Sequence, residues 1–301
     1  MRNPTCQGAG NTTVDHNEFF KFSRVEFPSG QALGIGACAI RAIPKGTCIL
    51  SEAPLIVASM LTLQENVNKL DEASRRQMFS LVDFHAPNGK AKTPLGIFRT
   101  NAYPCPGHID AGNSADFGGL FPICARFNSS CLPNVSHRYI PALNRLNIYT
   151  ASEISEGEEL LTCYIDPPYM TRDERRSVLL QRFNFVCNCE ACSLEGEKLT
   201  RSDVNRSRLK QLDAATFDLI RQGRYQRAIN AAEERLKLLQ LEMLNSPAAM
   251  VRVCYDAYQA CLHANEKDGA KLWLGLVLKY TKMCDSDNEV AGVQNLLDKL
   301  N

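Results

Sequence analysis

The stretch Cys187-Asn-Cys189-Glu-Ala-Cys192 places three cysteines within six residues, directly after a predicted helix. Three thiolates at this spacing converge readily on one tetrahedral zinc ion and leave one corner for a ligand from a distant segment. Cys131 is the first choice for that ligand, with Cys163 and Cys124 as alternatives. An ion with four protein ligands has no place for water, so the expected role is structural. The competing interpretation is a group of free cysteines near the surface. Exposed, clustered thiols are easily oxidised, so this interpretation is less favoured.

The composition around this cluster is that of a globular protein. The 301 residues, 45% hydrophobic and 22% charged, suffice for one large domain or two ordinary ones and exclude intrinsic disorder. The longest apolar stretch, residues 54–63, is much shorter than the roughly 20 residues of a membrane helix. The N-terminus lacks the apolar core of about 7 to 15 residues that marks a secretory signal. We therefore expect an intracellular protein, in the nucleus, the cytoplasm or both.

The cysteine count and the net charge narrow the range of partners. Thirteen cysteines in a reducing compartment indicate buried thiols and metal ligands rather than disulfides. The formal charge of +1 provides no general field to attract nucleic acid or an anionic membrane. We expect neither as a partner, and we expect a monomer.

Short β-rich pieces separated by glycine and proline predict small antiparallel sheets in the first half of the chain. Leu33-Gly-Ile-Gly36 is interpreted as a tight turn that opens a strand, and Pro44-Lys-Gly46 as a second turn. Helix-like spacing of apolar residues predicts a helical insertion at about 61–83, and glycine and proline predict loops over 84–119. The predicted strands are residues 37–41, 47–52, 145–150 and 160–164.

The second half of the chain is predicted to be helical. Thr171 and Glu174 form a capping-box pattern, so a helix begins here and leads to the cysteine cluster. After Ser193 we expect four or five consecutive helices, among them residues 225–244, and a further helix that Ser246-Pro247 begins. Residues 223–228 resemble the corner of a tetratricopeptide (TPR) helix pair. The predicted organisation is a flexible arm (1–18), a β-rich domain (19–170), a cysteine segment (171–193) and a helical domain (194–301).

Three further motifs have ordinary explanations when each is taken singly. The Gly34-Ile-Gly36 motif alone indicates a tight turn, because it lacks the third glycine of a dinucleotide fingerprint. The polar stretch Asn128-Ser-Ser-Cys131 suits a pocket wall but also any buried loop. A tyrosine at the end of a predicted strand, as Tyr164 is, is more often a core residue than a catalytic one.

In this order, however, the motifs resemble those of the SET-domain lysine methyltransferases, over residues 22 to 193. The chain is most similar to the SET and MYND domain branch, because of its long insertion, its three-cysteine segment and its helical tail. It has no MYND zinc finger, since residues 53–104 contain no cysteine. The resemblance implies an α+β fold: a β-rich SET domain of the β-clip type with a helical insertion, a zinc-bound post-SET segment, and an all-α TPR-like C-terminal domain.

The resemblance also implies roles for particular residues. S-adenosylmethionine is expected as the cofactor, bound by Gly34, Ile35, Gly36, Asn101, Asn128, Ser129 and Phe185. Tyr164 matches the active-site tyrosine of the family, and it would form the lysine channel together with Phe183. The expected zinc ligands of the single site are Cys131, Cys187, Cys189 and Cys192.

Two positions depart from the family pattern. The family usually has histidine where this chain has Ser129. A contact that the histidine makes through its backbone would be kept by serine, whereas a contact made by the imidazole ring would be lost. Related enzymes often carry tyrosine at the position of Phe183, and the missing hydroxyl is expected to change how many methyl groups are added.

The expected activity is S-adenosylmethionine-dependent methylation of a lysine in a histone or another protein, bound in a cleft between the SET and helical domains. One alternative is a catalytically weak SET scaffold that acts as a protein-interaction module, and Ser129 favours it. Another is a methyltransferase for small molecules or for residues other than lysine, because a fold alone does not determine the substrate.

Overall fold

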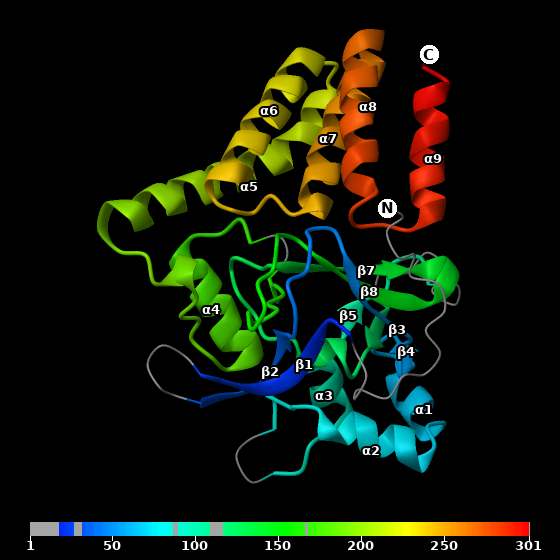
Figure 1. Ribbon diagram of the computed structural model, residues 1–301, viewed down its shortest axis with the longest axis vertical. Helices are drawn as coiled ribbons and strands as arrows, with labels where there is room; N and C mark the ends of the chain where they lie inside the picture. The colour runs from blue at the N-terminus through cyan, green and yellow to red at the C-terminus, as the bar shows by residue number, and fades with distance from the viewer. Residues whose placement is uncertain (1–17, 27–31, 87–89, 109–116, 166–167, 301) are drawn as a thin grey trace.

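The computed structural model describes residues 18–26, 32–86, 90–108, 117–165 and 168–300. Three regions follow one another along the long axis of the molecule (Figure 1): a helical array, a β-rich middle and a group of short helices. The chain runs from the middle to the short helices, back to the middle, and finally into the array. The predicted α+β class, with small sheets and a helical C-terminal region, is confirmed. The predicted arm lies outside the described residues except for Glu18.

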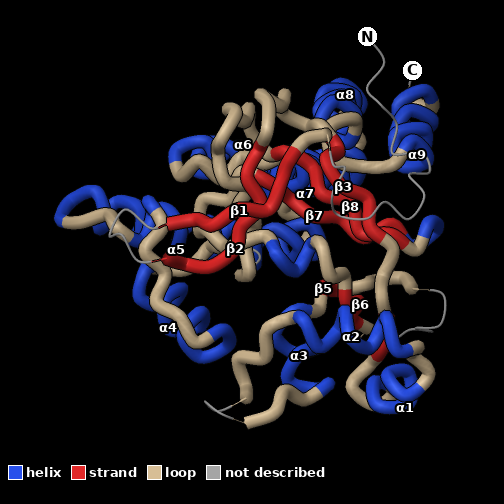
Figure 2. The backbone as a smooth tube through the Cα atoms, turned by 60° about the horizontal axis from the view of Figure 1, so that its bottom comes forward, coloured by secondary structure: helices blue, strands red, loops and turns tan. Residues whose placement is uncertain are grey.

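The β-rich middle consists of three small antiparallel sheets (Figure 2). One pairs two strands, and the others have the orders β3-β8-β7 and β4-β6-β5. Their inner faces form a core of aromatic and aliphatic side chains around Phe121, Phe127 and Leu146, which are fully buried. The strands are β1 (Phe20–Glu26), β2 (Ala32–Ala39), β3 (Cys48–Glu52), β4 (Ile56–Ala58), β5 (Tyr103–Pro104), β6 (Gly118–Leu120), β7 (Val135–Ile140) and β8 (Arg145–Thr150).

The helices fall into an insertion, a helix that leads to the cysteine cluster, and the C-terminal array. The insertion packs around its own small core, which includes Met78 and Ile97. The array packs around a larger core centred on Leu274 and Cys254. The helices are α1 (Leu63–Asn68), α2 (Glu72–Ser80), α3 (Pro94–Asn101), α4 (Arg172–Phe183), α5 (Gly196–Arg221), α6 (Tyr225–Leu241), α7 (Pro247–His263), α8 (Lys267–Thr281) and α9 (Asp287–Asp298).

Helix α3 corrects the prediction of loops between 84 and 119. The Thr93 hydroxyl accepts a hydrogen bond from the Gly96 N–H, and Pro94 occupies the first turn, so this segment has both ordinary signals of a helix start. The buried Asp83 carboxylate accepts hydrogen bonds from the Thr93 N–H and hydroxyl. It lies where a side chain at Gly96 would otherwise point, which explains a glycine inside this helix.

Two predictions about the sheets were also wrong. Gly34 and Gly36 lie within strand β2 rather than in a turn, and they pair with Val25 and Ser23 of β1. Residues 160–164 do not form a regular strand, because their backbone groups bond to two different segments. The Leu160 N–H donates to the Ala37 carbonyl, whereas the Thr162 N–H donates to the Asn128 carbonyl.

The helical array is fastened to the β-rich middle by polar contacts. Arg138 of β7 forms an ion pair of 2.6 Å with Asp285, whose side chain is only 5% exposed. The Lys45 ammonium donates to the Asn245 carbonyl at 3.3 Å. In the part of the chain that the structure describes, no helix is long and apolar enough to cross a bilayer.

Helix α4 begins with the capping box that the sequence predicts. The Thr171 hydroxyl accepts from the Glu174 N–H, and the Glu174 carboxylate accepts from the Thr171 N–H at 2.7 Å. We predict that Thr171→Ala lowers the free energy of unfolding by about 1 kcal/mol, because it leaves an orphan N–H at the helix start. Chemical denaturation measures this loss. Thr200→Ala inside α5 is the matched control, and equal losses in the two variants would contradict the prediction.

Candidate functional site

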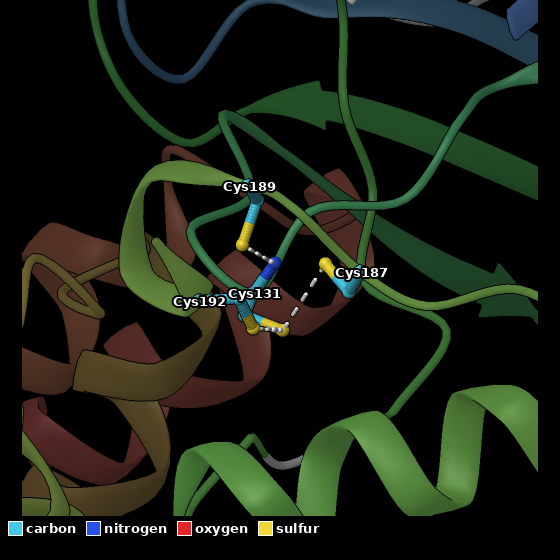
Figure 3. A group of neighbouring side chains, drawn as sticks. All are labelled: Cys131, Cys187, Cys189 and Cys192. Atoms are coloured by element: carbon cyan, nitrogen blue, oxygen red, sulfur yellow. Dashed lines mark hydrogen bonds between the residues drawn. The ribbon is translucent and has the colours of Figure 1, made fainter. Parts of the chain in front are cut away.

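Four cysteines converge beside helix α4, as Figure 3 shows. Their sulfur atoms all lie within 4.8 Å of one another. The Cys131 sulfur is 4.0 Å from that of Cys187 and 3.6 Å from that of Cys192. Sulfur ligands about 2.3 Å from a tetrahedral zinc are roughly 3.8 Å apart, so the cluster has the dimensions and the donor set of a structural zinc site. Of the three candidates for the fourth ligand, Cys131 is the one that joins the cluster.

The thiols of this cluster differ in acidity because they donate hydrogen bonds to one another. Hydrogen bonds from Cys131 and its neighbours hold the pKa of Cys189 well below its usual range, and they lower that of Cys192 to about 6. The pKa of Cys131 is raised, because its proton is shared with Cys187 and the other sulfurs. The cluster therefore has thiolate character at neutral pH, which is the form that binds metal.

Two arginines of helix α4 hold the cysteine segment in place. Arg175 is fully buried and donates to the Ala191 carbonyl, and its guanidinium lies 3.7 Å from the Cys192 sulfur. Arg176 donates to the carbonyls of Cys187 and Cys192 at 3.0 and 3.1 Å. The positive charge beside the sulfurs offsets part of the repulsion between thiolates.

A cavity of about 630 Å³ lies next to this cluster, between β2, α3 and the segment around Tyr164. Its walls include six of the residues that the sequence predicted for the cofactor and the lysine channel: Gly34, Ile35, Asn101, Asn128, Tyr164 and Phe183. The three others, Gly36, Ser129 and Phe185, are not among the described residues that line it, but each contacts a residue that does.

Tyr164 is held at this cavity by both its backbone and its side chain. Its N–H donates to the Ser129 hydroxyl at 3.1 Å, and its own hydroxyl donates to the Phe127 carbonyl at 2.9 Å. The ring lies 4.8 Å from that of Phe183 and edge-on to that of Phe185. Burial, with a smaller contribution from Glu159, raises the pKa of Tyr164 to about 12. The phenol is therefore a neutral, oriented group at physiological pH.

Asn128 is oriented by a carboxylate that the sequence analysis overlooked. The Asn128 side-chain NH2 donates to Glu159 at 2.8 Å, which leaves its amide oxygen free to accept. Burial raises the pKa of Glu159, and this hydrogen bond partly counters that effect. A methyl group at Gly36 would come within 2.3 Å of the same carboxylate, so a side chain there would displace Glu159 from its contact with Asn128. Glu159 directly precedes the predicted strand at 160–164, and nothing local in the sequence marks it as a partner of Asn128.

Tyr103 and His137 also line the cavity and were not predicted. The Tyr103 hydroxyl donates to the Cys124 carbonyl at 3.0 Å, and the His137 ring packs edge-on at 4.8 Å. Burial raises the pKa of Tyr103 well above its usual value, so it too stays neutral. Because the two residues lie far apart in the sequence, no local motif joins them.

A groove of about 580 Å³ runs between the β-rich middle and the helical array. Residues 132–137 line one side, and residues 243–246 with helix α7 line the other. His137 and Cys163 line both the groove and the cavity. The two spaces therefore adjoin at these two side chains.

Comparison with known proteins matches residues 34–165 to the SET domain model. The chain is 28% identical over 242 residues to a histone-lysine N-methyltransferase, set5, of Schizosaccharomyces pombe, which covers 80% of this chain and 72% of the relative. The chain therefore carries a SET domain, over residues 34–165. It is also 28% identical over 178 residues to the human N-lysine methyltransferase SMYD2, covering 54% of this chain and 40% of that protein. The SMYD2 of Xenopus laevis is 25% identical, with 54% and 41% covered.

These relatives confirm the resemblance inferred from the motifs, and they support the predicted enzyme class, a protein-lysine methyltransferase. This SET-domain protein spans only about 40% of the length of the SMYD2 relatives that it matches. The matched SET region includes the β2 glycines and Tyr164, together with Cys131 of the cysteine cluster. The tetratricopeptide character of the array and the individual site roles stay predictions.

The cysteine cluster generates a direct prediction about metal. We expect one zinc ion per chain in the purified protein, and we expect Cys189→Ser to lose it and to melt at a lower temperature, because a structural zinc supplies part of the folding free energy. Metal analysis and a thermal melt measure both effects. Cys163→Ser is the control, since that thiol is close by but outside the cluster and should leave the zinc content unchanged. A parent protein free of zinc would contradict the prediction.

Proposed function

We propose that this SET-domain protein transfers a methyl group from S-adenosylmethionine to a lysine side chain of another protein. The observation that carries the proposal is the placement of Tyr164, fixed by Ser129 and Phe127, at a cavity that Gly34 of β2 also lines. The cavity adjoins a groove large enough for a polypeptide segment. The proposed substrate is a histone or another protein, met inside the cell by a monomeric enzyme.

The cavity residues suit the proposed cofactor. Its volume of about 630 Å³ is within the range of small-molecule sites, which is roughly 300 to 1,000 Å³. Gly34, with a φ of +127°, has no side chain on that wall, so a ligand can lie close to the strand. The Asn128 amide oxygen, left free by Glu159, is an acceptor for an ammonium group. S-adenosylmethionine would supply the methyl group as an electrophilic sulfonium.

The residues on the lysine side would prepare the amine for transfer. A free lysine has a pKa of about 10.4 and is almost fully protonated at pH 7, yet only the neutral amine is a nucleophile. The rings of Tyr164 and Phe183 form an apolar wall, and a desolvated ammonium has a lowered pKa. The Tyr164 hydroxyl is a fixed dipole beside the reacting atoms, so its contribution is alignment and electrostatic stabilisation.

The cysteine cluster would stabilise the aromatic wall rather than take part in the reaction. Phe183 and Phe185 immediately precede Cys187, and all three pack in one cluster with Leu179. Zinc bound to the four thiolates would crosslink this segment to Cys131 of the SET domain. Loss of the metal would therefore loosen the segment that carries Phe183.

The competing proposal, a SET scaffold without activity, rested on serine at the position of the usual histidine. The Ser129 hydroxyl accepts the Tyr164 N–H, and Ser129 forms a parallel bridge to Thr162. The Ser129 hydroxyl therefore holds the backbone of Tyr164 in place, and Ser129 does this without lining the cavity. This contact favours the enzyme over the scaffold.

Replacement of the tyrosine tests the proposal. We predict that Tyr164→Phe loses methyl transfer by at least about 100-fold, as removal of one oriented polar group at a reacting centre does, and keeps its affinity for the cofactor. Labelled S-adenosylmethionine with histones, ribosomal proteins and whole lysate measures transfer, and calorimetry measures binding. Tyr139→Phe is the control, because its hydroxyl bonds to Asn144 away from the cavity. An unimpaired Tyr164→Phe variant, or a parent protein without cofactor affinity, would reject the proposal.

The pH dependence of the rate follows from the same site. Because the pKa of Tyr164 is raised to about 12, the phenol keeps its proton up to at least pH 10. We predict that kcat/KM rises with pH from 7 to 10 in a single ascending limb, set by deprotonation of the substrate lysine. Enzyme returned to pH 8 after each incubation shows whether the protein itself survived. A descending limb below pH 10 in enzyme that recovers fully would contradict this assignment.

A further inference from the structure

Two segments of the SET domain extend into the core of the helical array. Leu132, which directly follows the cluster ligand Cys131, packs against both the cysteine cluster and the array. Tyr169 lies a few residues beyond Tyr164 and is buried in the core of the array, with 6% of its surface exposed. The array therefore contacts the two segments that carry the predicted site residues.

A single arginine of the array joins these two segments. Arg206 of helix α5 is fully buried, and its guanidinium donates to the Pro168 carbonyl at 2.9 Å. Two of its nitrogens also donate to the Cys131 carbonyl, each at 3.4 Å. One planar cation thus bridges carbonyls that are 37 residues apart in the sequence, next to Leu132 and Tyr169.

The position of the guanidinium is itself fixed by a buried carboxylate. The Arg206 Nε donates to Glu242 at 3.1 Å, and Glu242 also accepts from Ser202 and Asn205 at 2.5 and 2.8 Å. Glu242 is only 8% exposed. Separating the pair would leave an uncompensated buried charge on each partner. The ion pair and its hydrogen bonds therefore hold the guanidinium in one position.

The two bridged segments meet again at the site itself. The Ser129 hydroxyl accepts from the Tyr164 N–H, and the Ser130 N–H donates to the Thr162 carbonyl at 2.8 Å. The Cys131 carbonyl that accepts from Arg206 therefore lies in the same segment as the Ser129 contact to Tyr164 and as the cysteine cluster.

We propose that Arg206 is a positioning residue, through which the helical array sets the position of the Asn128–Cys131 segment relative to Pro168 and Tyr169. It reaches neither the cavity nor a sulfur in these contacts, and it acts through the two carbonyls and Glu242. The array is in this respect part of the catalytic unit as well as a wall of the groove. The catalytic consequence rests on the proposed function, whereas the positioning itself does not.

The test compares two equally buried arginines of the array. Arg206→Lys keeps the charge but loses the planar fork that spans two carbonyls. Arg235→Lys is the matched control, because Arg235 is also fully buried and pairs with Asp213 and Asp256 within the array. Glu242→Gln is a milder second variant, which keeps the shape of the side chain and removes its charge.

Three readouts on the full-length protein separate positioning from a general loss of stability. For Arg206→Lys we expect faster amide exchange at residues 128–132, 134, 162–165 and 169, zinc release to a chelator faster by about 10- to 100-fold, as for other groups that orient metal ligands, and a lower kcat. Glu242→Gln should show the same pattern to a smaller extent. Arg235→Lys should change thermal stability only.

Each outcome either supports or overturns the positioning role of Arg206. Parent-like exchange and zinc release in both Arg206→Lys and Glu242→Gln would overturn the proposal, and so would equal effects in Arg235→Lys. If the parent protein methylates no protein, the proposed function fails, but amide exchange still decides the positioning role. If the parent transfers methyl groups and only the Arg206 and Glu242 variants lose rate, both proposals stand.

Discussion

The site depends on one contact between two chain segments, the hydrogen bond from the Tyr164 N–H to the Ser129 hydroxyl. It lies beside the parallel bridge between Ser129 and Thr162, and the segments come from parts of the chain more than 30 residues apart. This contact brings the wall of the cavity next to the tyrosine, and Cys131 extends the same segment into the cysteine cluster. The proposed cofactor wall and the cysteine cluster therefore share one stretch of backbone, to which the proposed reacting centre is hydrogen-bonded.

Burial sets the chemical character of the groups along this backbone. The pKa values of Tyr164, Tyr103 and Glu159 are all raised by desolvation. The cavity therefore presents neutral phenols, and Glu159 lies behind Asn128, from which it accepts a hydrogen bond. At the cysteine cluster the pKa of Cys189 is lowered instead, because neighbouring thiols donate hydrogen bonds to it. Neutral phenols at the cavity and lowered thiol pKa values at Cys189 and Cys192 thus follow from the packing of neighbouring segments.

The sequence predicted the elements whose signals are local. Capping residues marked the start of α4 and α7, and three closely spaced cysteines marked the cluster. The same kind of signal marked α3 at Thr93-Pro94, but the helix is short and its glycine obscured it. The missing strand at 160–164 and the role of Glu159 depend on contacts between distant segments, which no local pattern contains. Cys131 was chosen over Cys163 and Cys124, and in the structure it is the one of the three that lies with the other cysteines of the cluster.

The polar contacts at the edges of the groove have a consequence for what enters it. Arg138 is paired with Asp285 and Lys45 with the carbonyl of Asn245, while Arg206 joins helix α5 to the Pro168 carbonyl. These contacts oppose a movement that would separate the array from the β-rich middle. On the proposed function, a groove held in this way favours a substrate lysine in a flexible tail or loop, because such a segment can lie along the groove. A lysine in a rigid helix or sheet would not reach the cavity.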